Sequence, residues 1–161
     1  MEFIGRSLRR TEGTPAEPLA RLRALLDWRL AQLDRPNRSR VMRDELSAFG
    51  WWFASEKFDP EWALERLLRV LEVTGAAEPD HLVAEVLAKR ADLPTANVLR
   101  AVQLMVENDR DGRSVLGWQE EARTILERAI AGANPELRAR ANTIIDALVA
   151  RRFHDFRTVS R

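Results

Sequence analysis

The sequence predicts an all-α protein, and three observations support that prediction. Apolar residues recur at helical spacing through most of the chain, and no run of alternating β-branched residues competes with this pattern. Asp59-Pro60, Leu93-Pro94 and Asn134-Pro135 each open an apolar segment, and their prolines lie 34 and 41 residues apart. Proline fits the first helical turn, where its missing N–H would be unbonded anyway. The recurrence indicates paired helices joined by short connections.

The beginning of the chain lacks this pattern. Residues 1–17 contain Gly5, Gly13 and Pro15 and show little periodicity. We expect a flexible N-terminal lead that contributes nothing to the core. Residues 18–158 are expected to form a single α-helical repeat domain.

The first two helices are predicted from their apolar stripes. Leucines at i, i+3/i+4 and i+7 spacing predict a helix over residues 19–34. A stripe of Met42, Leu46, Phe49 and Phe53 predicts a second helix over residues 39–55, with Gly50 as a modest weakness inside it.

The helix over residues 60–74 has the clearest boundaries. Asp59 is a good N-cap, Pro60 suits the first turn, and Gly75 follows the last turn as a C′ residue. Further stripes predict helices over residues 79–91, 94–108, 115–131 and 135–151. In the last two helices the apolar residues fall at the same relative positions, so that Trp118 aligns with Leu137.

The choice between an open stack and a closed bundle depends on how many sides of a helix are buried. A middle helix of a stack touches neighbours on two sides, whereas one stripe suffices in a bundle. The helix over residues 60–74 carries Trp62, Ala63, Val70 and Val73 outside its main stripe. We therefore predict a short, degenerate α-solenoid of antiparallel hairpins, with a closed helical bundle as the alternative.

Composition and charge narrow the class of protein. The chain has 161 residues, no cysteine and a net charge of +1. Its charge is uneven, with net values of +5, −7 and +3 over residues 1–43, 44–150 and 151–161. Residues 1–10 lack the apolar core of a signal peptide, and no run approaches the ~20 apolar residues that span a membrane. We expect a cytoplasmic protein that does not bind membranes.

The sequence offers no recognisable reaction chemistry. Neither lysine follows the glycine pair of a phosphate-binding loop, and His81 and His154 lie 73 residues apart without a zinc-binding motif. The acidic stretch over residues 107–112 does not fit a calcium loop, because Trp118 stands where a bidentate Glu is required. We predict no enzyme activity, no cofactor and no metal.

A basic segment is one candidate for binding. Arg35, Arg38, Arg40 and Arg43 surround a Pro-Asn turn, and their guanidinium groups suit a phosphate backbone. No recognition-helix motif accompanies them, and neighbouring acids offset part of their charge. A nucleic-acid backbone is therefore the second candidate partner.

The tryptophans point to a protein partner. On a helix over residues 39–55, Trp51 lies roughly 170° from the main stripe. Packing against a neighbouring helix or Trp62 is one interpretation, and an exposed interface anchor is the other. The anchor interpretation places the partner surface along the edge of the helices over 39–55 and 60–74, with Trp51 and Trp62 as anchors and Arg66 and Arg69 at the rim.

Several stretches, in this order, resemble a known family: FGWWFASEKFDPEWALERL, EPDHLVAEVLA, ENDRDGRSVLGWQEEARTILERAI and LVARRFHDFR. They are similar to the C-terminal helical-repeat region of large bacterial conflict-type NTPases, STAND-like ATPases among them, many suspected in antiphage defence. The resemblance covers roughly residues 45–158 and includes no catalytic residue. Its strongest features are Phe53 to Trp62, the Gly117-Trp118 helix start and the terminal Asp155-Phe156-Arg157.

This resemblance implies a HEAT-like sensor or scaffold region whose NTPase and effector modules would lie on an upstream segment. We predict a non-enzymatic domain that binds another protein, such as an NTPase or effector module, as a C-terminal part of a bacterial antiphage-type ATPase system. A small Arg-rich helical protein that binds a nucleic-acid backbone is the alternative.

Two substitutions test the predicted core faces. Leu67→Ala and Ile144→Ala should each lower the free energy of unfolding by ~2–5 kcal/mol, because each truncates a buried aliphatic side chain. Chemical denaturation of the purified variants measures the change. Unchanged midpoints would mean that the wrong helix faces were assigned to the core.

Overall fold

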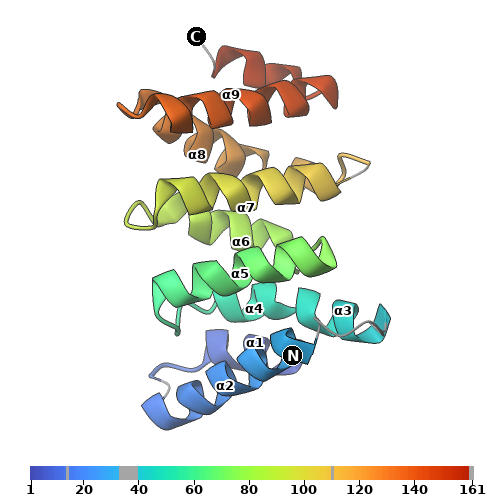
Figure 1. Cartoon of the computed structure of the whole chain (residues 1–161), viewed down its shortest axis with the longest axis vertical. Coiled ribbons are helices and arrows are strands. Elements are labelled where there is room, and N and C mark those ends of the chain that lie inside the picture. The colour runs from blue at the N-terminus through green and yellow to red at the C-terminus, as the bar shows by residue number, and fades with distance from the viewer. Residues whose placement is uncertain (14, 33–39, 110, 160–161) are drawn as a thin grey trace. The chain divides into compact units, whose positions relative to one another are not determined.

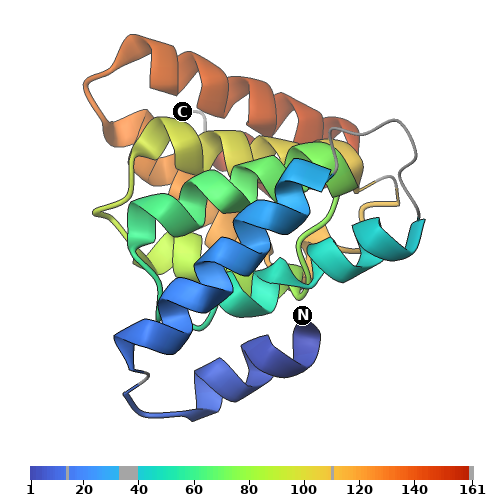
Figure 2. The ribbon, with the colours of Figure 1, turned by 60° about the horizontal axis from the view of Figure 1, so that its bottom comes forward.

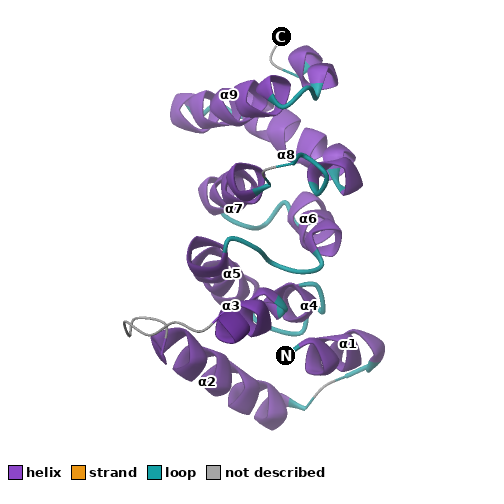
Figure 3. Ribbon diagram, turned by 90° about the vertical axis from the view of Figure 1, so that its right-hand side faces the viewer, coloured by secondary structure: helices purple, strands orange, loops and turns teal. Residues whose placement is uncertain are grey.

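The computed structural model of the protein describes residues 1–13, 15–32, 40–109 and 111–159. Within these residues 77% are helical and no strand is present (Figures 1 and 3), which confirms the all-α prediction. Tertiary contacts divide the chain into two compact units, Met1–Val83 and Ala84–Arg161. That residues 18–158 form a single domain stays a prediction.

The helices of the first unit are α1 (Glu2–Arg10), α2 (Ala16–Gln32), α3 (Arg40–Ser47), α4 (Phe49–Phe53) and α5 (Pro60–Thr74). The boundary between the units falls inside α6 (Asp80–Lys89). The second unit continues with α7 (Thr95–Asn108), the 3₁₀ turn η1 (Val115–Gly117), α8 (Gln119–Ala131), α9 (Pro135–Ala150) and the 3₁₀ turn η2 (His154–Thr158).

Helix α5 begins and ends where the sequence predicts. The Asp59 carboxylate accepts a hydrogen bond from the backbone N–H of Trp62 at 2.9 Å. Gly75 ends the helix in the left-handed region at φ 80°, a conformation that glycine adopts without steric cost. Trp62 and Leu64 are both buried although they lie about 160° apart around the helix axis, so the predicted two-sided burial of α5 is confirmed.

The helix predicted over residues 39–55 is wrong in one respect, because it is interrupted at Ala48. The backbone of Glu78 crosses the chain here, and its N–H donates to the Ser47 carbonyl at 2.7 Å. A Cβ atom on Gly50 would lie 2.5 Å from the Glu78 carbonyl oxygen. Gly50 is therefore the residue that lets the two backbones approach, and not a mere weakness in a helix.

The expectation that residues 1–17 contribute nothing to the core is also wrong. Helix α1 packs on α4, and its Leu8 is buried. Gly5 allows the close approach, since a Cβ there would lie 2.4 Å from the Cβ of Trp51. The indole N–H of Trp52 donates to the Met1 carbonyl at 2.9 Å. These contacts use a glycine and a backbone carbonyl, which a search for apolar stripes does not detect.

An aromatic cluster forms the centre of the first unit. Trp52 and Phe58 stack with ring centroids 5.7 Å apart, and Trp62 lies 5.3 Å from Phe58 and 6.4 Å from Phe49. All of these side chains are at least nine-tenths buried. Rings at these separations add favourable contacts to the burial of their area, so the cluster joins α4 to α5.

The second unit is organised around α9. This helix packs against α7, α8 and η2. The Asn134 side chain caps its N-terminus by accepting hydrogen bonds from the backbone N–H groups of Glu136 and Leu137 at 2.9 and 3.3 Å. The helix predicted over residues 115–131 is interrupted at Trp118, which is buried, and the sequence does not predict η2.

Gly5→Ala tests whether α1 depends on its close approach to α4. The added methyl group collides with Trp51, and overpacking of this kind should lower the free energy of unfolding by about 1–3 kcal/mol. Hydrogen exchange should show faster exchange in α1 than in the wild-type chain.

Gly117→Ala is the matched control, because nothing lies within 4 Å of the corresponding Cβ position. Equal protection of α1 in the Gly5→Ala variant and the control would contradict the packing described.

Candidate functional site

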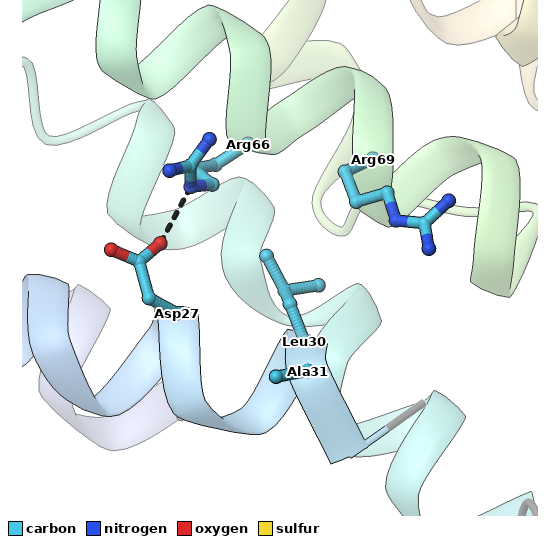
Figure 4. Close-up of a pocket in the computed structure, with 5 residues that line it drawn as sticks. All are labelled: Asp27, Leu30, Ala31, Arg66 and Arg69. Carbon is cyan, nitrogen blue, oxygen red and sulfur yellow. Dashed lines mark hydrogen bonds and ion pairs between the residues drawn. The ribbon is translucent and has the colours of Figure 1, made fainter. Parts of the chain in front are cut away.

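A groove lies between α2 and α5 in the first unit (Figure 4). Its volume is about 520 Å³. Helix α2 lies across α5 (Figure 2) and supplies one wall, while α5 supplies the other. The residues that line the groove are Asp27, Leu30, Ala31, Arg66 and Arg69.

The position of α2 depends on charged and cation–π contacts. Asp27 pairs with Arg66 at 2.6 Å between Oδ1 and Nε, and Arg29 pairs with Glu45 at 2.9 Å. The Arg23 guanidinium lies 4.7 Å from the centre of the Trp62 ring. Leu26 and Leu30 are the buried residues of this 17-residue helix. Helix α2 is therefore held by a short apolar contact with ionic contacts around it.

Arg66 is fixed in place by its neighbours. Its side chain is 30% exposed, pairs with Asp27, and lies with its guanidinium 5.7 Å from the centre of the Trp62 ring. A partly buried guanidinium that is paired and stacked keeps one geometry. Arg69, one turn further along α5, is exposed and lines the same groove (Figure 4).

The outer face of α2 exposes large apolar side chains. Trp28 is 54% exposed and Leu25 is 43% exposed. At 100° per residue, Trp28 lies about 60° from Ala31 and about 60° from Leu25 around the helix axis. The exposed apolar face thus begins at the groove. We call the groove residues together with Trp28 and Leu25 the α2–α5 surface.

The predicted protein-binding residues are only partly brought together. Arg66 and Arg69 lie in the groove. Trp62 is 8% exposed, so the expectation that its ring is an exposed anchor is wrong, because the ring packs in the aromatic cluster beneath Arg23 and Arg66. Trp51 is half-buried beneath α1, with the Arg6 guanidinium 4.7 Å from the centre of its ring.

Trp28 was not among the sequence candidates. Its signal is present in the sequence, since it is a tryptophan outside the leucine stripe of its helix. Asp27 was missed for a different reason: its partner Arg66 lies 39 residues away, and no local pattern relates the two.

The structure describes only two of the four arginines that were predicted to bind a nucleic-acid backbone. Arg35 and Arg38 lie outside the described residues. Arg40 and Arg43 are exposed on α3, and Arg40 lies 3.8 Å from Asp44, one helical turn away. This acid offsets the charge of Arg40.

Other kinds of site find no support in the described part of the chain. No group of three or more His, Asp or Glu residues there could hold a metal ion. A helix with the length and apolar character needed to cross a membrane is also missing from those residues. In the loop before α7, a hydrogen bond from Arg90 lowers the pKa of the exposed Asp92 carboxyl to about 2. A lowered pKa favours a permanent charge, which does not suit a general acid or base near neutral pH.

No protein-family model, curated protein or solved structure matches the chain. Function is therefore inferred from the surface of the chain itself.

Two tryptophan substitutions test this assignment of core and surface. Trp62→Ala should lower the free energy of unfolding by about 3–5 kcal/mol, because it empties the centre of the aromatic cluster. Trp28→Ala should change it by no more than about 0.5 kcal/mol, because the side chain is exposed. Denaturant titrations of both variants provide the comparison, and equal losses would contradict the assignment.

Proposed function

We propose that the protein is a non-enzymatic protein-binding domain, acting as a scaffold or sensor, and that it binds its partner across the α2–α5 surface. The observation that supports this most directly is the exposure of Trp28 and Leu25 beside a groove. Tryptophan is enriched among the residues that contribute most to protein interfaces. An exposed apolar face next to fixed charges is typical of an interaction surface.

The chemistry of the groove favours one kind of partner segment. Leu30 and Ala31 offer an apolar floor, and Arg69 stands at one wall. A segment with an apolar side chain next to a carboxylate would fit, with the carboxylate toward Arg69 and the apolar group over Ala31. The partner would then also cover Trp28.

The fold, the kind of partner and the cellular location predicted from the sequence are part of the same proposal. We retain the predicted short HEAT-like α-solenoid, which the two-sided burial of α5 and the packing of α8 on α9 support. An NTPase or effector module as partner, a place in an antiphage-type ATPase system and a cytoplasmic location follow from the sequence and its family resemblance. The nucleic-acid alternative receives no further support from Arg40 and Arg43.

Site-specific photo-cross-linking in cells tests this proposal. A photoreactive residue at Ala31, in the groove, should yield a discrete cross-linked product that is sensitive to protease and resistant to nuclease. The same residue at Ala139, an exposed position on α9, is the control and should not yield that product. Trp28→Ala and Arg69→Glu should each reduce the product, since they remove apolar contact and reverse a charge.

Two outcomes would contradict the proposal. The first is the same product from both positions. The second is a product from position 31 that persists in the Trp28→Ala variant, provided that this variant unfolds at the wild-type denaturant midpoint. A product that nuclease removes would instead support the nucleic-acid alternative.

A further inference from the structure

The second unit has a cavity of its own, which the proposed function does not use. It has a volume of about 450 Å³ and lies between residues 111–119, which end at the first residue of α8, and residues 151–156, which follow α9. The residues that line it include Asp111, Leu116, Arg151, Arg152, Phe153 and Asp155.

Specific contacts hold the walls of this cavity. Gly112, at φ 68°, lies under the Phe153 ring, and a Cβ there would be 3.3 Å from Cε2 of that ring. Phe153 meets Phe156 edge to face with ring centroids 6.5 Å apart. Arg123 of α8 donates to the Asp155 carbonyl at 3.2 Å and lies over the Phe156 ring. The two segments therefore pack against each other.

Arg152 occupies a position where glycine is the usual residue. It has φ 75° at the end of α9, with the Phe153 N–H bonded to the Leu148 carbonyl and its own N–H bonded to the Val149 carbonyl. This is the hydrogen-bond pattern of a Schellman cap, whose left-handed residue is most often glycine because other residues are strained there. A non-glycine residue at a strained position beside a cavity points to a functional role.

The arginine side chain is available to a ligand. In the part of the chain that the structure describes, no ion pair or side-chain hydrogen bond engages the Arg152 guanidinium. Across the cavity Leu116 is 61% exposed, and Phe153 is half-buried. The site therefore offers a guanidinium and an apolar surface together.

The remaining charges limit the ligand to one negative charge. Two arginines, Arg151 and Arg152, and two aspartates, Asp111 and Asp155, line the cavity. Two carboxylates in the lining repel a dianion such as phosphate more strongly than a monocarboxylate, and they can accept N–H groups of the ligand. Guanidinium and carboxylate form strong paired hydrogen bonds.

We propose that this cavity binds the C-terminal residue of a peptide. The peptide carboxylate pairs with Arg152, and its apolar side chain packs against Leu116 and Phe153. The peptide backbone N–H groups face Asp111 and Asp155. This site belongs to the second unit, and its occupation does not depend on the α2–α5 surface.

Titration of the full chain with N-acetyl-leucine, followed by amide NMR, tests this proposal. The compound has a single carboxylate and an apolar side chain, as the C-terminal residue of a peptide does. Shifts in residues 111–119 and 151–156 should saturate with a Kd in the millimolar range, which suits a ligand of this size. N-acetyl-leucinamide, which lacks the carboxylate, should bind about tenfold more weakly.

Arg152→Gly separates binding from folding. Glycine relieves the strained backbone, so the melting temperature should stay the same or rise. Binding of N-acetyl-leucine should weaken about tenfold, because one charged hydrogen-bonding group is lost. Arg140→Ala is the control, since it removes the same charge from an exposed position on α9 outside the cavity. This variant should bind as the wild-type chain does.

Three results would overturn the proposal. One is the absence of saturable shifts in these segments for the wild-type chain. Another is equal binding by the wild-type and Arg152→Gly chains. The third is equal affinity for N-acetyl-leucine and acetate, because the apolar contact would then contribute nothing. Loss of binding in Leu116→Ala, whose altered side chain is exposed, would support the proposed orientation.

Discussion

The aromatic cluster of Phe49, Trp52, Phe58 and Trp62 is the contact on which the first unit depends. Two of its rings are tied to other parts of the chain. The indole N–H of Trp52 is satisfied by the Met1 carbonyl, and leaving a buried donor unpaired costs about 1–3 kcal/mol. Trp62 receives the Arg23 guanidinium of α2 on its face. The positions of α1 and α2 therefore follow from a cluster that α4 and α5 build.

The sequence could predict those helix boundaries and buried faces that local chemistry determines. Helices α5 and α9 were placed correctly because an acid or amide cap, a proline and an apolar stripe all lie within a few residues of one another. The buried faces followed from helical periodicity, which depends only on spacing along the chain. Arg66 and Arg69 were selected for the same reason, since they lie outside the main stripe of α5.

What the sequence could not predict depends on contacts between distant residues. The break between α3 and α4 follows from a hydrogen bond between Ser47 and Glu78. Gly5 lets helix α1 pack closely on α4. From the sequence alone this glycine indicates flexibility, because its contact with Trp51 is not known. Trp62 was taken for an anchor because periodicity alone does not show that Phe49, Phe58 and Arg23 surround its ring. In the first two cases the decisive contact joins residues more than 25 positions apart in the sequence.

The weak attachment of α2 links the structure of the first unit to its proposed function. Partly exposed ion pairs contribute about 0.2–1 kcal/mol each, so the pairs with Arg66 and Glu45 position α2 more than they stabilise it. A helix held in this way can leave Trp28 exposed, because the packing of α2 does not use that side chain. A partner bound across the α2–α5 surface, as proposed, would cover Trp28 and the groove that contains the ion pair between Asp27 and Arg66. Its binding and the docking of α2 would then stabilise each other, as linkage requires for a ligand that binds only the docked state.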